Sequence, residues 1–283
     1  MPSLWFCVPV HGRLELTAIC LRQLRRTCDA LNEEGVHASA VIVASKQDLR
    51  ALPDLGFGSV ERDNKYLGRK FNDGIMLATD PRYNGKPADY VVPCGSDDWV
   101  DHRLFLDLPA QDTIIGFQRM SFVREDGQAM ISASLDYRGG SGIRIIPRAL
   151  VEPLTYRPAD EDRRRACDTS ILSNLTMFHE GRLKVEHRYL HDRQIVDWKT
   201  RDTQINSFQV VSDQWRDEET VDPFTELAGL YPAEALEEMR SYYVRQRNIC
   251  SRCQKWPAVA AGCNTWDGPV CDGCSRLPAL VSA

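Results

Sequence analysis

The C-terminal part of the chain carries four cysteines in two closely spaced pairs. Cys250 and Cys253 form one CxxC pair, and Cys271 and Cys274 form a second pair after 17 intervening residues. Four thiolates at this spacing can close a tetrahedral shell around one zinc ion. Two idle or redox pairs are the alternative. Since a closed shell leaves no open position for a substrate, the pattern predicts a structural Zn²⁺ site, with Cys263 outside the shell.

A second candidate site is acidic. Asp97 and Asp98 follow Asp89–Cys94, a segment with the composition of a buried strand. In open α/β sheets, ligands bind beyond the carboxyl ends of strands. Two adjacent carboxylates at such a position can hold a hard divalent cation against a diphosphate. An ordinary Asp-rich turn has the same composition, so the place at a strand end is what favours a metal site.

A glycine-led helix start lies upstream of these acids. Gly68 is followed by Arg69 and Lys70 and then by the apolar side chains of Phe71 and Ile75. The free N–H groups at a helix N-terminus, together with two cations, can help neutralise a phosphate. The same residues also suit an ordinary amphipathic helix.

The segments that would position these residues alternate between strand and helix. The apolar runs Leu4–Val10, Ala38–Ala44 and Asp89–Cys94 are typical of buried parallel strands. A helical stripe lies between the first two runs and consists of Leu16, Cys20, Leu24, Cys28 and Leu31. This alternation predicts βαβ units in a mainly parallel sheet. Further along the chain we expect strands at Thr113–Phe117, Met130–Leu135 and Gly142–Ile146, and helices at Glu161–Leu175 and from Pro232 towards Arg247.

Composition and charge limit the class of protein. The 283 residues are 43% hydrophobic and 27% charged, which suits a globular core. The formal net charge of -5 provides no overall field that attracts a polyanion. No segment approaches the roughly 20 apolar residues of a membrane span, and the N-terminus lacks the basic region of a signal peptide. We therefore expect a cytoplasmic protein without a membrane partner. Its single cysteines are then buried thiols, namely Cys7, Cys20, Cys28, Cys94 and Cys167.

The order of these motifs resembles that of family 2 glycosyltransferases of the GT-A fold. Val8–Arg13 is similar to the end of the family's first strand, and Gly68 with Asn72-Asp73-Gly74 is similar to its Gly…Asn-x-Gly helix. Gly95–Asp98 is similar to its Asp-x-Asp element, except that Gly95 stands where the first Asp is usual. Two acceptor-side motifs, Gly139-Gly140 and the helix segment Ala166–Leu172, complete a resemblance that covers about residues 4–200.

The resemblance implies a set of site residues. The donor would lie against Pro9, Val10, His11, Arg13, Arg69, Lys70, Asn72, Ser96 and Asp97. Asp97 and Asp98 would bind Mn²⁺ or Mg²⁺, together with His187 or His191, each of which can also be an ordinary surface histidine. Asp168 would be the catalytic base, with Asp162 and Glu161 as reserves, and Gly139 and Gly140 would lie on the acceptor side.

The resemblance also implies the fold and its units. We expect an α/β fold of the GT-A (Rossmann-like) type, with a mainly parallel sheet flanked by helices and a small C-terminal zinc ribbon. Residues 1–230 would form the transferase domain, with a donor half at about 1–100 and an acceptor half at about 101–230. A connecting helix at 231–248 and a zinc module at 249–283 would follow.

The implied activity is metal-dependent transfer of a sugar, with inversion, from a UDP-, GDP- or dTDP-linked donor to an acceptor hydroxyl. A glycan, a protein and a hydroxylated DNA base all remain open as acceptors, and the oligomeric state is not specified. A nucleotidyltransferase of similar fold is a second hypothesis, although His11-Gly12-Arg13 stands where such enzymes carry a Gly-rich, Lys-containing loop. A third is a zinc-ribbon adaptor that binds nucleic acid or protein. The cationic stretch from Arg240 to Lys255 favours it, and the net charge disfavours nucleic acid.

Overall fold

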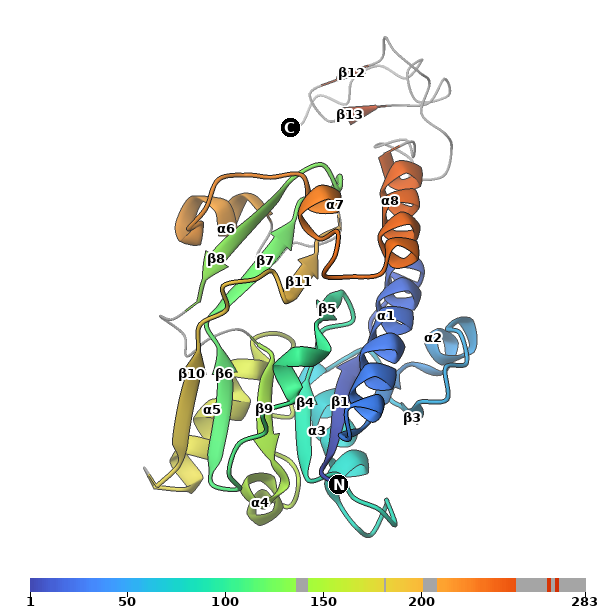
Figure 1. Cartoon of the computed structure of the whole chain (residues 1–283). Coiled ribbons are helices and arrows are strands. Elements are labelled where there is room, and N and C mark those ends of the chain that lie inside the picture. The colour runs from blue at the N-terminus through green and yellow to red at the C-terminus, as the bar shows by residue number, and fades with distance from the viewer. Residues whose placement is uncertain (136–141, 181, 201–207, 248–263, 266–267, 270–283) are drawn as a thin grey trace, which may run out of the picture.

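The structure is a computed structural model that describes residues 1–135, 142–180, 182–200, 208–247, 264–265 and 268–269. Within these residues the chain has a mixed α/β fold with two main sheets (Figure 1). The larger is a seven-stranded, mainly parallel sheet flanked by helices, as expected, and has the order β10-β6-β9-β4-β1-β2-β3. No helix of the described residues is long and apolar enough to cross a bilayer.

The parallel half of the large sheet is built around the first strand. β1 (Ser3–Pro9) pairs in parallel with β2 (His37–Ala44) on one side and with β4 (Tyr90–Pro93) on the other, and β3 (Gly58–Glu61) extends the sheet beyond β2. Apart from His37 at the start of β2, the residues of β1, β2 and β4 are buried or partly buried. Strands covered on both faces read as near-continuous apolar runs, which is why the sequence predicted these three.

The other half of the large sheet is mixed. β9 (Arg144–Pro147) is antiparallel to β4 and to β6 (Thr113–Phe117). β10 (Lys184–Arg188) pairs in parallel with β6 and forms the edge. β9 begins two residues later than expected, and Gly142 stays in the loop that precedes it.

Helices cover both faces of the large sheet (Figure 1). α1 (Leu14–Glu33) packs its apolar stripe on the face that carries Leu4, Phe6 and Val8. α3 (Leu67–Thr79) and α5 (Cys167–Phe178) cover the opposite face, which carries Cys7, Val41 and Val43. The two faces alternate along β1 because successive side chains of a strand point to opposite sides. The five single cysteines are free and buried, as expected.

Short elements complete this region. α2 (Lys46–Ala51) is capped by Ser45, whose hydroxyl accepts from the Asp48 N–H. The 3₁₀ turn η1 (His102–Phe105), the short helix α4 (Arg148–Val151) and the 3₁₀ turn η3 (Glu152–Leu154) lie in connections. A two-stranded pair near the C-terminus consists of β12 (Asn264–Thr265) and β13 (Gly268–Pro269).

The smaller sheet has the order β5-β11-β7-β8. β11 (Ile195–Trp198) is antiparallel to β5 (Asp98–Val100) and parallel to β7 (Arg119–Val123), and β8 (Met130–Ser134) pairs with β7. β5 follows β4 after a short turn, so the small sheet stands at the carboxyl end of the parallel strands (Figure 1). α6 (Phe208–Trp215) and α7 (Pro223–Glu226) pack beside it.

The last long helix, α8 (Ala233–Arg247), packs against the main body. It runs antiparallel to α1, with ion pairs from Arg22 to Glu238 and from Arg245 to Glu15. Its apolar side chains join a core under the small sheet that includes Trp99, Trp198, Leu236, Met239 and Tyr243. The helix expected at this position is therefore present, and it contributes to the core.

One expected helix begins late. The sequence predicted a helix over Glu161–Leu175, whereas α5 begins at Cys167. Ala166 has a φ of 53°, and a non-glycine residue in this left-handed region interrupts a right-handed helix. The segment before it forms a loop whose charges pair locally, including Arg157 with Glu161 and Arg163 with Asp160.

Candidate functional site

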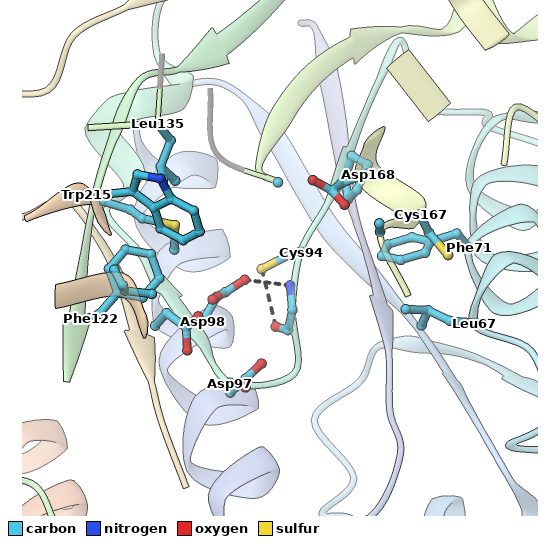
Figure 2. A pocket seen from close by; sticks show the side chains of 17 residues that line it. Leu67, Phe71, Cys94, Asp97, Asp98, Phe122, Leu135, Cys167, Asp168 and Trp215 are labelled. Carbon is cyan, nitrogen blue, oxygen red and sulfur yellow. Dashed lines mark hydrogen bonds between the residues drawn. The ribbon is translucent and has the colours of Figure 1, made fainter. Parts of the chain in front are cut away.

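Two adjoining hollows lie at the carboxyl ends of β1 and β4, and they share the side chains of Leu67, Phe71 and Asp97 and the backbone of Gly95. The first, of about 510 Å³, is called here the cationic hollow and is lined by Pro9, His11, Arg13, Asn64, Lys65, Lys70, Ser96 and Arg164. The second, of about 330 Å³, is called the acidic hollow (Figure 2). It is lined by Asp98, Asp168 and Asp197 together with apolar side chains that include Phe122, Leu135 and Trp215. Asp97 faces both hollows.

Three carboxylates gather where the large and small sheets meet. Asp97 and Asp98 follow β4, and Asp98 is the first residue of β5. Asp197 in β11 lies directly opposite Asp98 in the antiparallel pairing. Like charges placed opposite each other across two strands are unfavourable, so this arrangement needs a cation or a proton nearby.

Gly95 fits this turn because it has no side chain. Its N–H donates to the Asp98 Oδ2 at 2.8 Å. A Cβ at this position would lie 2.5 Å from the same oxygen and 3.0 Å from the Asp97 Oδ1. The backbone at Gly95 therefore holds the Asp98 carboxylate in place.

The electrostatics of the cluster follow from this crowding. Removal from water and the neighbouring Asp197 and Asp97 carboxylates raise the pKa of Asp98 well above its usual value. Burial also raises the pKa of Asp197 to about 6, although the Lys199 ammonium opposes the shift. The Oδ1 of Asp197 is buried and has no hydrogen-bond partner within the described part of the chain. A positive charge placed among these oxygens would therefore stabilise their ionised forms.

Two cations already contact the cluster. Lys199 forms an ion pair with Asp197, and the Arg13 guanidinium bonds the Asp97 Oδ2 at 2.5 Å. Arg13 precedes the first residue of α1 and has a φ of 48°, next to Gly12 with a φ of 64°. Two successive left-handed residues form a sharp turn after β1, and they bring Arg13 to the acids. A non-glycine residue in this conformation costs about 1–3 kcal/mol and is common at functional sites.

The donor set fits a divalent cation that arrives with its substrate. Among the described residues no group of three or more His, Cys, Asp or Glu side chains is placed to hold a metal by itself. Mg²⁺ is usually bound by one or two carboxylates together with substrate phosphates and water. Asp97 and Asp98 supply such a pair, and the unpartnered oxygen of Asp197 adds a further negative charge beside it.

The cationic hollow contains one buried ammonium. The Lys70 side chain is 2% exposed and donates to the Val10 carbonyl and to the Asn64 Oδ1. Burial lowers the pKa of Lys70 to about 8, against the opposing effect of Asp48 and Asp63. At neutral pH it therefore remains mostly charged. Together with Arg13, Lys65 and Arg164 it gives this hollow a positive lining.

Asp168 lies in the acidic hollow, across from Trp215 (Figure 2). It is the second residue of α5, and the left-handed Ala166 before it also lines the hollow. The buried Arg144 of β9 donates to the Asp168 carbonyl at 3.3 Å and lies 4.0 Å from its carboxylate. A Cβ at Gly142 would contact the Asp168 side chain at 3.6 Å, so Gly142 lies against this acid.

Several residues expected at the site line the hollows, and others do not. Pro9, His11, Arg13, Lys70, Ser96 and Asp97 line the cationic hollow. Val10 is fully buried and contributes only its carbonyl to Lys70. Arg69 lines neither hollow and instead pairs with Asp162 and lies over the Tyr66 ring. Glu161, the other reserve acid, is engaged with Arg157.

Asn72 lies in the core behind the site. It is 0% exposed, and its amide makes two hydrogen bonds of 2.8 Å with the backbone of Ala159. The Asn72 amide therefore fixes the backbone of the segment that leads to α5. This corrects the expectation that it faces a donor.

The two histidines proposed as metal ligands also lie elsewhere. His187 is on the edge strand β10 and is exposed, and His191 is exposed beside the Tyr189 ring. Neither lines either hollow. β10 is the edge strand of the large sheet, and β6 and β9 separate it from β4. Gly139, Gly140, Cys250, Cys253, Cys271 and Cys274 fall outside the described residues.

The sequence reading missed Asp197, Arg164 and Trp215. A signal for Asp197 was present, because Asp197-Trp198 repeats the Asp-Trp dipeptide of Asp98-Trp99. The two tryptophans pack edge to face with ring centroids 4.9 Å apart, which keeps the two aspartates together. Arg164 belongs to the run Arg163-Arg164-Arg165. The sequence alone does not distinguish this run from an ordinary solvated segment.

Comparison with known proteins gives matches only at the level of structure. No family model matches the chain, and no curated protein matches its sequence. A Drosophila β-1,4-galactosyltransferase 7 mutant in complex with manganese, UDP-Gal and xylobiose is similar over 77% of this chain and 82% of that chain, with 13% identity and a TM-score of 0.48. A 4-diphosphocytidyl-2C-methyl-D-erythritol synthase from Anaerococcus prevotii is similar over 68% and 91%, with 14% identity and a TM-score of 0.41.

A galactosyltransferase in complex with donor and acceptor sugar analogues is similar over 86% of this chain and 96% of that chain, with 9% identity and a TM-score of 0.37. All three TM-scores lie below 0.5. We therefore base the function on the residues of the two hollows.

Proposed function

We propose that this chain is a metal-dependent, inverting glycosyltransferase of the GT-A type that resembles family 2. The observation that carries the proposal is the position of Asp97 between a cationic and an acidic hollow. A nucleotide sugar is itself divided in this way, into an anionic diphosphate and a neutral sugar. Its diphosphate fits the cationic hollow, and its sugar and the acceptor fit the acidic hollow.

The cationic side would bind the leaving group. As the bond between the sugar and the diphosphate breaks, negative charge develops on the phosphate oxygens. Arg13, Lys70 and Arg164 line the hollow where this charge would appear, and preorganised cations stabilise developing charge strongly in a partly dry site. Arg13 would exchange its ion pair with Asp97 for the phosphates. A divalent cation held by Asp97 and Asp98, Mn²⁺ or Mg²⁺, would act as a Lewis acid towards the same oxygens.

The acidic side would activate the acceptor. A hydroxyl is a poor nucleophile at neutral pH, and a carboxylate can take its proton as the new bond forms. Asp168 is partly exposed in the hollow, at 38% of its side chain, and Arg144 fixes the backbone that carries it. In a single displacement the acceptor oxygen bonds to the anomeric carbon on the face opposite the diphosphate, and the diphosphate leaves with the bonding electrons. The configuration is therefore inverted.

The units proposed for the chain follow from this assignment. The transferase would occupy residues 1–230, with a donor half to about residue 100 and an acceptor half beyond it. Residues 249–283 would form a module that binds one structural zinc through Cys250, Cys253, Cys271 and Cys274. The donor would be a UDP-, GDP- or dTDP-linked sugar.

Donor binding tests the proposal first. The purified protein is screened for thermal stabilisation by a panel of nucleotide sugars with Mn²⁺. A ligand at about 100 times its Kd adds about 2.7 kcal/mol of stability.

Asp97→Asn should lose the metal-dependent part of the stabilisation and all turnover, while its own melting temperature stays close to that of the wild type. Asp107→Asn is the matched control, since Asp107 is 85% exposed and pairs with Arg188 away from the hollows. A full response in Asp97→Asn would remove the basis of the proposed metal site.

A further inference from the structure

We propose that the acceptor is a neutral carbohydrate whose sugar ring lies in the acidic hollow between Trp215 and Asp168. This inference rests on the proposed function and names the acceptor class, which the reaction alone leaves open. It is carried by two properties of the acidic hollow, its charge and its apolar wall.

The charge of the two hollows differs sharply. The described residues that line the acidic hollow include four aspartates, Asp97, Asp98, Asp168 and Asp197, and no Lys, Arg or His. The cationic hollow has the reverse composition, with Arg13, Lys65, Lys70 and Arg164 against Asp97 alone. The cations that contact its carboxylates are already engaged, Arg13 with Asp97, Lys199 with Asp197 and Arg144 with the backbone and carboxylate of Asp168.

An anionic acceptor would find no counter-charge among these lining residues, because the divalent cation proposed at Asp97 and Asp98 would be engaged by the donor diphosphate. A phosphorylated lipid or a DNA backbone would bring phosphates towards carboxylates, and like-charge contacts of this kind are costly in a partly buried site. A neutral polyhydroxy compound has the opposite character, because each hydroxyl can donate a hydrogen bond to a carboxylate. Bonds to an ionised acceptor are about twice as strong as neutral ones.

The apolar wall fits the C–H groups on the face of a sugar ring. Phe122 of β7, Leu135 after β8 and Trp215 of α6 lie on one side of the acidic hollow, and Met120 and Val211 also line it. In Figure 2 Trp215 and Phe122 stand on the side of the hollow opposite Asp168. The face of an aromatic ring carries negative quadrupole charge, so it attracts the slightly positive C–H groups of a pyranose face. A ring packed on Trp215 would then direct its edge hydroxyls across the hollow towards Asp168.

The volume agrees with a small ligand. About 330 Å³ is at the low end of the range for small-molecule sites. One sugar ring of the acceptor and the transferred sugar would fill this space, while further units of a glycan would extend out of the opening. A protein backbone would instead require exposed N–H and C=O partners along the wall, which the side chains of Phe122 and Leu135 do not offer.

Binding of defined probes tests the inference. Full-length protein is saturated with Mg²⁺ and the nucleoside diphosphate that gives the largest stabilisation. Neutral methyl glycosides and disaccharides are then compared with sugar phosphates and with a hydroxymethylcytosine oligonucleotide, by saturation-transfer NMR and as acceptors in turnover. We expect neutral sugars alone to bind and react. Trp215→Ala should raise the acceptor KM about tenfold or more, while the nucleoside diphosphate Kd changes less than twofold.

Control variants separate stacking from folding. Trp215→Phe should recover most of the acceptor affinity, because it keeps an aromatic face. Tyr83→Ala should leave the acceptor KM unchanged, since Tyr83 is 59% exposed and lines neither hollow. The inference is overturned if the diphosphate binds and only a phosphorylated acceptor or the oligonucleotide reacts, or if Trp215→Ala leaves the KM unchanged. If no nucleoside diphosphate binds, the proposed function fails first and the acceptor assignment fails with it.

Discussion

At the scale of single residues, the site depends on charges that balance each other in the absence of ligand. Asp97 is paired with Arg13, and Asp197 is paired with Lys199. Asp98 lies between them and its pKa is raised by burial and by its acidic neighbours. A divalent cation with a diphosphate would supply both the positive charge that the acids need and the negative charge that Arg13 needs. Metal and nucleotide should therefore bind cooperatively at this site.

The proposed base can be separated from the donor site at the same scale. Asp168→Asn keeps the shape of the side chain and removes the proton acceptor. Donor affinity should remain nearly unchanged, because Asp168 lines the acidic hollow only. Transfer should fall by about 10²- to 10⁴-fold, the usual contribution of general base catalysis.

Calorimetry of the donor and turnover on one sample test both halves of this prediction. Equal losses of affinity and turnover would mean that Asp168 shapes the donor site. Undiminished turnover would transfer the base role to another acid. Asp162 and Glu161, the reserves, are engaged with Arg69 and Arg157 in the loop before α5.

At the scale of elements, the site depends on how closely α3 is held to its neighbours. A Cβ at Gly74 would lie 2.2 Å from the Cys7 Sγ, and a Cβ at Gly68 would lie 1.9 Å from the Asp160 carbonyl oxygen. These two glycines allow α3 to contact β1 on one side and the loop before α5 on the other. Asn72 then fixes that loop through Ala159, so α3 and α5 hold the two hollows in a constant relation.

This account predicts a structural effect for Asn72→Ala. The substitution leaves the N–H and the carbonyl of Ala159 buried without partners, which should lower the free energy of unfolding by about 2–4 kcal/mol. Nucleotide affinity of the folded protein should change little, because Asn72 does not line a hollow. Denaturant unfolding and nucleotide titration measure the two quantities. Asn84→Ala is the control, since the Asn84 amide donates to the Ala78 carbonyl at 3.5 Å and accepts from the nearby Lys86 N–H at 3.0 Å in a partly exposed turn. A large loss of nucleotide affinity with normal stability would restore Asn72 to the donor site.

Some elements of the fold were predictable from the sequence, and others were not. β1, β2, β4 and α1 were predictable because an uninterrupted apolar run or a clean helical stripe reports burial directly. The start of α5 was not, because nothing in the sequence signals a left-handed Ala166. The clamp made by Asn72 was also hidden, since its partner is a backbone segment 87 residues away.

At the scale of the whole molecule, the acidic cluster is formed by two segments that lie about 100 residues apart in the chain and meet only in the small sheet. Asp98 and Asp197 become neighbours through the pairing of β5 with β11. Pairing between distant strands cannot be read from local periodicity, which is why the sequence predicted Asp97 and Asp98 but not Asp197. The underlying core brings α1 and α8 together with Trp99 and Trp198.

Truncation tests the role of α8 and of the zinc module. A chain that ends at Arg247 should melt cooperatively at nearly the wild-type temperature, because it keeps α8 on the core. A chain that ends at Pro232 should lose cooperative unfolding. It removes Leu236, Met239 and Tyr243 from the core, and each buried side chain of this size contributes about 1.5–3 kcal/mol to a typical total of about 5–15 kcal/mol. A normal melt of the shorter chain would show that α8 is dispensable.

Elemental analysis of the same chains locates the zinc. The full-length protein, washed with a weak chelator, should retain one equivalent of zinc, and the chain that ends at Arg247 should retain none. Zinc in the shorter chain, or its absence from the full-length protein, would contradict the assignment to Cys250, Cys253, Cys271 and Cys274.

The most direct test of the central claim follows one reaction mixture by ¹H and ³¹P NMR. It contains the protein, Mg²⁺, the nucleotide sugar that stabilises the protein most and a neutral disaccharide. We predict that nucleoside diphosphate accumulates in equal amount with a new glycosidic linkage of inverted anomeric configuration, and that Asp97→Asn abolishes both signals. A product of retained configuration would contradict the proposed single displacement. Cleavage of the nucleotide sugar only after pyrophosphate is added, with formation of nucleoside triphosphate, would show nucleotidyl transfer and contradict the account as a whole.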